Sequence, residues 1–286
     1  IAGDDDQAIF KWAGADVDHF IALKEEVNDI KVLNQSYRIP GGPIHELSQN
    51  IINKVQNRFD KDYKPRDEEG ILKRYSDITQ VDMSKGNWLV LSSANYFLDD
   101  AKDLCEIQGW YYQFKGRNSI PLKLLMALNN WEAWRKDAQL NHLEIKNIYE
   151  YLGSHVLPGF QKGKTLHSDT KYLMRDCRAE HGLVTDSVWY EAFEGLDNMT
   201  ETYIRNMRAN GEMINKNPRI IMSTIHGAKG GEADKVLLMQ DITNAALETF
   251  SHDPDELHRL FYTGATRAKR ELHVLDPKDF DRAYIL

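Results

Sequence analysis

The sequence predicts an α/β fold in which a mainly parallel sheet carries helices on both faces. Short apolar, β-branched runs alternate with longer segments of helical periodicity, and this alternation is typical of strands joined by crossover helices. Apolar residues make up 42% of the 286 residues and charged residues 28%, which are ordinary proportions for a globular protein with a sizeable core.

The elements follow from local pattern and spacing. The expected strands are the apolar runs at 31–33, 88–92, 110–114, 219–224, 235–239 and 271–275. The expected helices lie at 17–25, 42–55, 97–108, 122–134, 144–152 and 255–267. The charged segment 60–82 lacks periodicity, so we expect a loop or an excursion at the edge of the sheet.

The stretch 130–217 has a different character. It has little β-branched clustering and shows helical patterns at 172–180, 187–193 and 201–210. We therefore expect a mostly helical insertion that divides the α/β domain into the parts 31–129 and 218–286.

Composition excludes several classes of protein. No apolar run approaches the length that spans a bilayer, so we expect no membrane association. Cys105 and Cys177 lie far apart and indicate a reduced, cytoplasmic protein with neither a disulfide framework nor a metal site. The net charge of -8 disfavours a broad basic surface for nucleic acid but allows a narrow basic or aromatic track.

The first segment with candidate functional residues is GDDDQAIFKWAGAD, at residues 3–16. Gln7 can both donate and accept hydrogen bonds, and so can contact a phosphate and a water together. Trp12 offers a face on which a base can stack, a contact of about 1–3 kcal/mol. Taken alone, an acidic run is more often a solvated loop or a helix cap, and a Trp more often packs.

A second segment, LNQSYRIP at 33–40, contains Tyr37 and Arg38. The planar guanidinium of Arg38 can reach a phosphate and Tyr37 can stack on a base, although a surface ion pair and an edge tyrosine are the simpler interpretation. The third segment, IIMSTIHGAKGGE at 220–232, is a buried run that ends in a glycine-rich loop. Its glycines, Gly230 among them, allow close approach to a ligand, and Thr224 and His226 lie where ligands bind open α/β sheets.

The fourth segment, ELHRLFYTGATRAKREL at 256–272, has apolar residues at helical spacing and places Arg267 near the helix end. The simple alternative is a basic helix terminus that complements the dipole. Gly163-Lys164-Thr165 looks like the end of a P-loop, but Pro158 stands where that pattern needs a glycine, so we expect a charged loop.

Together and in this order, the four segments resemble motifs III, IV, V and VI of UvrD/Rep-like superfamily 1 DNA helicases. The resemblance implies two RecA-like domains, with residues 1–30 ending the first and the α/β part forming the second motor domain. It implies ATP between the two domains and single-stranded DNA across them.

Roles follow from the matching positions. The resemblance implies that Gln7 senses the γ-phosphate and the attacking water, that Arg38 contacts the γ-phosphate, and that Arg267 is an arginine finger. Tyr37 would stack on adenine, Gly230 would line the nucleotide site and Glu232 would contact the ribose. Trp12, Thr224 and His226 match DNA-contacting positions, and Phe10 is expected to assist them in binding DNA.

The sequence also departs from the family. Ala13 stands where Arg is usual, and Gly231 and Ala233 stand where Leu and Phe are usual, so one polar contact and the packing behind the third segment are altered. The P-loop and the Mg²⁺ ligands would lie upstream of Ile1, so we expect an absent first half and no ATP hydrolysis by this chain alone.

The resemblance predicts part of an ATP-dependent DNA helicase or translocase of 3′–5′ polarity. A non-catalytic nucleic-acid or partner-binding module that keeps the fold is the alternative. A nuclease-fused helicase subunit is disfavoured because no carboxylate–Lys nuclease pattern is present. The sequence leaves the oligomeric state, the DNA structure preferred and the pathway open.

Overall fold

A computed structural model describes residues 2–14, 16–212 and 217–286. The chain divides into two compact units. Unit 1 comprises Ile1–Cys105, Tyr112–Gly116 and Arg219–Leu286, and unit 2 comprises Glu106–Tyr111 and Arg117–Pro218. The predicted α/β fold with a helical insertion is confirmed in its main features.

Unit 1 is built on a mainly parallel sheet with the strand order β3-β11-β10-β4-β9-β5-β6. Its strands are β3 (Ile71–Tyr75), β11 (Ala268–Leu275), β10 (Ala233–Met239), β4 (Trp88–Ser92), β9 (Ile220–Thr224) and β5 (Tyr112–Phe114), and the last strand in the order, β6 (Arg117–Asn118), falls in the chain segment of unit 2. The neighbouring pairs from β3 to β5 are all parallel. Every residue of the central strand β4 is buried, as expected where helices cover both faces.

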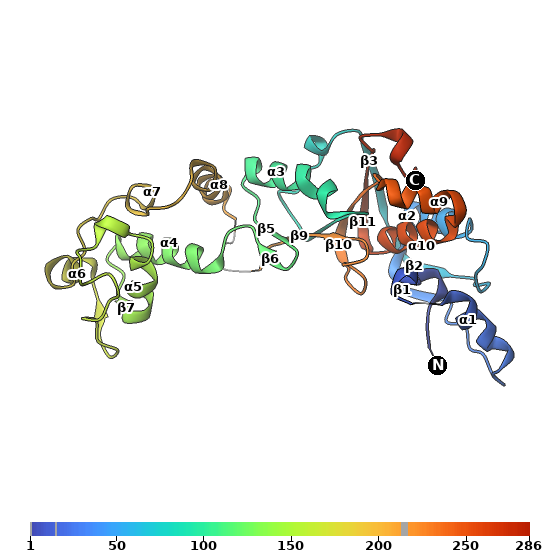
Figure 1. Cartoon of the computed structure of the whole chain (residues 1–286), viewed down its shortest axis with the longest axis horizontal. Coiled ribbons are helices and arrows are strands. Elements are labelled where there is room, and N and C mark those ends of the chain that lie inside the picture. Colours follow the sequence, from blue (N-terminus) through green and yellow to red (C-terminus); the bar gives the residue numbers. More distant parts are fainter. Residues whose placement is uncertain (1, 15, 213–216) are drawn as a thin grey trace. The chain divides into compact units, whose positions relative to one another are not determined.

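Helices cover the two faces of this sheet. The helices are α2 (Pro43–Ile52), α3 (Asp99–Gln108), α9 (Asn244–His252) and α10 (Pro254–Ala265). In Figure 1, α2, α9 and α10 lie on one face and α3 lies on the other. Side chains alternate along β10, so Val236 and Leu238 join the core with Ile44 of α2 and Phe261 of α10, while Leu237 points to the other face.

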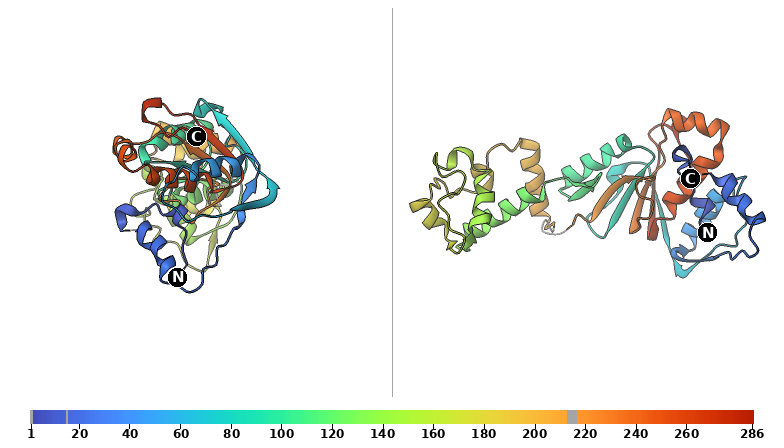
Figure 2. Two further views of the ribbon diagram at one scale, coloured as in Figure 1. Left: turned by 90° about the vertical axis from the view of Figure 1, so that its right-hand side faces the viewer. Right: turned by 60° about the horizontal axis from the view of Figure 1, so that its bottom comes forward.

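A second, small parallel sheet joins β1 (Gln35–Gly41) to β2 (Lys64–Glu69). The N-terminal residues form short helical turns, η1 (Asp5–Gln7) and η2 (Lys11–Ala13), followed by α1 (Val17–Ala22) and η3 (Leu23–Glu25). Both views in Figure 2, like Figure 1, place these first turns beside α10, and η1 and α10 are in contact. The remaining short turns of unit 1 are η4 (Ile78–Gln80), η5 (Asn95–Leu98) and η7 (Phe280–Arg282).

Unit 2 is mostly helical, as predicted. Its elements are α4 (Leu122–Trp134), β7 (Leu140–Asn141), α5 (His142–Tyr149), η6 (Gly153–His155), β8 (Lys171–Tyr172), α6 (Met174–Glu180), α7 (Trp189–Ala192) and α8 (Asn198–Ala209). The buried rings of Trp131, Trp134 and Phe193 meet edge to face in its core. Because α4 belongs to this unit, the compact helical part is larger than the segment 130–217.

Some predicted elements differ from the structure. The strand expected at 31–33 is wrong, since the strand forms later, at β1. The segment 60–82 is not a loop throughout, because it supplies β2 and β3, and β3 is an edge strand as the alternative allowed. Helix α9 was not predicted. Within the described residues, no helix is long and apolar enough to cross a membrane.

Candidate functional site

The first and last of the predicted segments meet in unit 1. Gln7 ends η1, and Arg267 follows the C-terminal end of α10. The Nη2 group of Arg267 donates a hydrogen bond to Oε1 of Gln7 at 2.6 Å. The contact between η1 and α10 thus brings together two side chains that are 260 positions apart in the sequence.

Arg267 is a buried cation whose acceptors are neutral. Its side chain is only 2% exposed. Besides the Gln7 amide, it donates to the carbonyl oxygens of Thr263, at 2.9 Å from Nε, and Gly231, at 3.4 Å from Nη1. Burial, together with the nearby positive charge of Arg38, lowers the pKa of Arg267 from its ordinary value to about 10. A buried charge of this kind gains most from an anionic partner.

Arg38, Glu232 and Lys269 form a charged group beside Arg267. Nη1 of Arg38 lies 4.0 Å from a Glu232 carboxylate oxygen, and Lys269 Nζ lies 3.0 Å from the other. The hydrogen bond from Lys269 lowers the pKa of Glu232, and burial opposes this shift. The Nε atom of Arg38 is buried and has no hydrogen-bond partner within the described part of the chain. Tyr37, next in sequence, is 87% exposed, so its ring is accessible for stacking.

The glycine-rich loop after β9 supplies backbone to the same region. The Thr224 hydroxyl accepts a hydrogen bond from the Gly227 N–H at 3.1 Å, which fixes the start of the loop. Gly230 has a φ of +88°, a conformation that favours glycine, and it precedes the Gly231 carbonyl that binds Arg267. The structure therefore places Gly230 and Glu232 close to Arg267, as a shared site requires.

Phe10 and His226 form a neighbouring aromatic group. Their ring centroids are 5.8 Å apart. Lys229 connects this pair to the first group, since its Nζ lies 5.0 Å from the Phe10 centroid and donates to the Gln7 carbonyl at 2.9 Å. Burial lowers the pKa of His226, although a hydrogen bond with the Ile9 backbone opposes the shift, so a neutral imidazole is favoured. The side chain of Trp12 lies outside the described residues.

A comparison with known families bears on this region. Residues 161–276, which include Thr224, His226, Glu232 and Arg267, match the UvrD-like helicase C-terminal domain. This part of the chain is therefore similar to the C-terminal domain of UvrD-like helicases. This match confirms the predicted resemblance of the chain to the C-terminal portion of UvrD/Rep-like superfamily 1 helicases. No curated protein matches the chain.

Residues 161–276 also contain two basic residues near the site that the local sequence pattern does not mark. Lys229 precedes Glu232 in the third segment and donates to the Gln7 carbonyl. Lys269 lies in the fourth segment and forms an ion pair with Glu232. Lysines at loop positions give no distinctive pattern, so only the fold reveals their contacts. Conversely, Gly163-Lys164-Thr165 lies in a loop that follows no strand, which confirms that it is not a P-loop.

The acidic and other metal-ligating side chains of the described residues form no metal centre. Among residues 2–14, 16–212 and 217–286, no group of three or more His, Cys, Asp or Glu side chains is arranged to hold a metal ion. The acidic run Asp4–Asp6 is close to Lys61, whose Nζ lies 2.5–3.0 Å from a carboxylate oxygen of each residue.

Proposed function

We propose that this protein is part of a helicase motor that couples ATP hydrolysis to movement on single-stranded DNA, with 3′–5′ polarity by resemblance to its family. One observation carries the proposal. Arg267 is a buried cation held by neutral oxygens, one of them from Gln7, with a second guanidinium, Arg38, close by. Two arginines and an amide that converge in this way suit the terminal phosphate of a nucleotide.

The proposed roles follow from position and chemistry. Arg38 and Gln7 contact the γ-phosphate, and Gln7 also orients the attacking water through its amide. Arg267 stabilises the charge that develops on the equatorial oxygens during phosphoryl transfer. Exposed Tyr37 stacks on adenine, Gly230 brings backbone close to the nucleotide, and Glu232 accepts hydrogen bonds from the ribose.

ATP would bind with Mg²⁺, and the residues of this chain fit the nucleotide rather than the metal. Arg267 is buried and donates its hydrogen bonds to neutral oxygens, which supports a phosphate ligand. The metal ligands and the P-loop belong, in this proposal, to the first RecA-like half. The assignment of residues 1–30 to the end of that half is part of the same proposal.

Single-stranded DNA is the proposed partner of Phe10, Trp12, Thr224 and His226. The paired rings of Phe10 and His226 beside Lys229 combine an aromatic surface with a positive charge. Aromatic faces and local cations are the features that bind single strands without sequence preference. Contact between Lys229 and Gln7 supports a direct link between DNA and the nucleotide site.

Arg267 provides the test of the proposed function. In the complete helicase, Arg267→Ala should reduce DNA-stimulated kcat by on the order of 10³-fold, because an arginine finger acts mainly in the transition state. The KM for ATP should change far less. Arg267→Lys should recover little activity, since a point charge cannot form the same planar set of hydrogen bonds. Steady-state phosphate release with excess single-stranded DNA measures both variants beside the wild type.

Arg74→Ala is a matched control, because Arg74 is exposed on the edge strand β3. It should leave kcat unchanged. Near-normal turnover in Arg267→Ala would show that Arg267 only stabilises the end of α10. Tight DNA binding with no ATP hydrolysis in the wild type would instead favour a non-catalytic nucleic-acid-binding module.

A further inference from the structure

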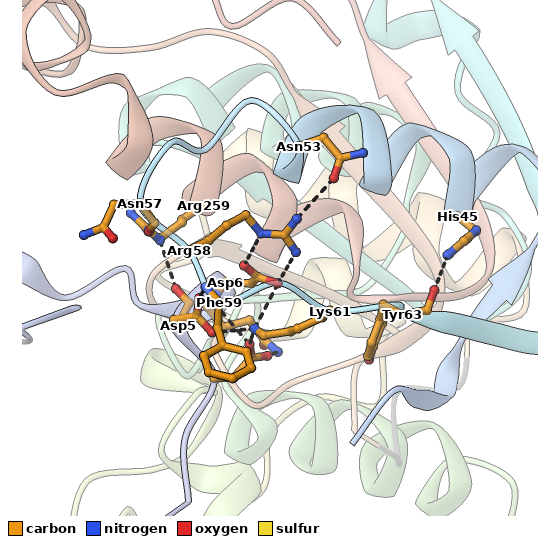
Figure 3. Close-up of polar contacts among 12 residues, drawn as sticks. Asp5, Asp6, His45, Asn53, Asn57, Arg58, Phe59, Lys61, Tyr63 and Arg259 are labelled. Carbon is orange, nitrogen blue, oxygen red and sulfur yellow. Dashed lines mark hydrogen bonds and ion pairs between the residues drawn. The ribbon is translucent and has the colours of Figure 1, made fainter. Parts of the chain in front are cut away.

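Lys61 is the centre of an ion network around the acidic turn that precedes Gln7. Its Nζ lies 2.8 Å from Asp4, 2.5 Å from Asp5 and 3.0 Å from Asp6, measured to one carboxylate oxygen of each. The Lys61 side chain is only 13% exposed. Figure 3 shows Lys61 extending from the segment after α2 toward the carboxylates of Asp5 and Asp6.

Other groups hold the same turn. Arg58 donates to both carboxylate oxygens of Asp6, from Nε at 3.0 Å and from Nη2 at 2.9 Å. The Phe59 N–H donates to Asp5 at 2.7 Å, and Arg259 of α10 donates to the Asp5 carbonyl at 2.9 Å. Figure 3 shows these contacts converging on η1. The turn is therefore fixed both to the segment 53–61 and to α10.

A chain of hydrogen bonds continues from this network into the candidate site. Asp4 accepts from Lys61 through Oδ1 and from the Gln7 amide nitrogen through Oδ2. The Gln7 amide oxygen in turn accepts from Arg267. An amide can be flipped to exchange its donor and acceptor ends. The Asp4 carboxylate can only accept and the Arg267 guanidinium can only donate, so the Gln7 amide has only one orientation that satisfies both.

We propose that Lys61 is a positioning residue that acts through Asp4 to fix the Gln7 amide with its oxygen toward Arg267. Its positive charge keeps Asp4 ionised and places the carboxylate where it can accept only the NH₂ end of Gln7. Lys61 is not among the residues proposed to contact nucleotide or DNA, so its effect on turnover is indirect. The inference rests on the proposed function, because it gives Lys61 a role in setting the geometry of the phosphate site.

The test compares variants of two neighbouring lysines in the complete helicase. Lys61→Met should lower DNA-stimulated kcat by about 10²-fold, the effect of a misplacement of about 1 Å, while the KM for ATP changes little. Lys61→Arg should restore most of this loss, because a guanidinium keeps the charge and the reach. Lys64→Met is the matched control, since Lys64 is largely exposed and its nearest acidic partner is Asp62, at 3.7 Å. It should leave kcat unchanged.

A double-mutant cycle separates positioning from stabilisation. If Lys61 acts through Gln7, then Lys61→Met should cause no further loss of kcat in a Gln7→Ala background. A residue that only stabilises the fold would lower activity equally in both backgrounds. Thermal melts of the same preparations measure the stability of each variant independently.

Asp4→Asn keeps the proposal testable if Lys61→Met does not fold. Lys61 retains Asp5 and Asp6 in this variant, whereas Gln7 loses its charged acceptor. We expect a lower kcat with a smaller loss of stability than in Lys61→Met. If Gln7→Ala has a lowered kcat, then a wild-type kcat in Asp4→Asn or in a folded Lys61→Met variant would overturn the inference. A fully active Gln7→Ala would instead refute the proposed function of Gln7 itself.

Discussion

His273 is buried in the main sheet of unit 1 among polar neighbours. Its ring stacks on Tyr75 with centroids 5.6 Å apart, and its two nitrogens lie 3.1 Å from the Tyr75 hydroxyl and from Glu271. Lys73 and Lys235 also approach Glu271. Burial lowers the pKa of His273 to about 4, despite the opposing effect of Glu271. The imidazole therefore stays neutral in the folded protein at neutral pH.

This burial predicts a pH-dependent loss of stability. Between pH 6.5 and about 4, His273 binds a proton in the unfolded chain but not in the folded one. The free energy of unfolding should therefore fall as the pH decreases through this window, by at most about 3 kcal/mol. His273→Gln should remove this part of the slope. Urea melts at several pH values measure it, and His19→Gln on the exposed α1 surface serves as the control. Equal slopes in wild type and His273→Gln would contradict the prediction.

At the scale of single residues, the motif positions could be predicted but their supporting contacts could not. Gln7, Arg38, Glu232 and Arg267 were expected in one site, and the structure brings them together. Lys61 was missed because a lysine in a charged segment carries no sign of a partner 55 to 57 positions earlier. Such contacts depend on how η1 packs, which local sequence does not determine.

Gly109 shows how one position limits the packing of an element. It follows α3 with a φ of +67°, and an added Cβ would lie 2.4 Å from the Asn206 backbone carbon in α8. Gly116 has a similar φ of +73°, but its Cβ would meet nothing within 4 Å. The two glycines share the same conformational demand and differ in their surroundings.

Alanine substitutions at these glycines should therefore separate the two effects. Gly116→Ala should cost about 1 kcal/mol from the left-handed backbone alone. Gly109→Ala should cost at least about 2 kcal/mol more, because α8 has to move away from the new methyl group. Denaturant melts followed by circular dichroism measure both. Equal destabilisation would indicate that α8 moves without cost.

At the scale of elements, errors in prediction have physical causes. The run at 31–33 has strand-forming residues, but Val32 is 37% and Leu33 75% exposed, and ladder pairing with β2 begins only at Gln35. A strand needs a partner for its backbone as well as the right side chains. Helix α9 has no fully buried residue, and only the short set Ala246, Leu247 and Phe250 packs against the core, so its apolar stripe is easily overlooked. Charged edge strands such as β3 are similarly difficult to recognise.

At the scale of the molecule, unit 2 should fold independently. Its core is made from its own residues, among them Trp131, Trp134, Ile145 and Ile148. The segment 106–218 expressed alone should keep its helical circular dichroism and melt cooperatively. The shorter segment 130–217 should be much less stable, because it lacks buried Leu124, Leu125 and Leu128 of α4. Equal melting temperatures for the segments 106–218 and 130–217 would contradict the conclusion that α4 belongs to the core of unit 2.

The chain segment of unit 2 is inserted at the end of the strand order that holds β9, β5 and β6. The chain leaves the sheet after β5 and β6 and returns in β9, the direct neighbour of β5. The inner strands β4, β10 and β11 are formed without any residue of the insertion. Gene rearrangement at this point could therefore lengthen, shorten or exchange the inserted module while the inner strands of the main sheet stay intact. Descendants of a common ancestor should differ more in length between β6 and β9 than anywhere else in the sheet-forming part of the gene.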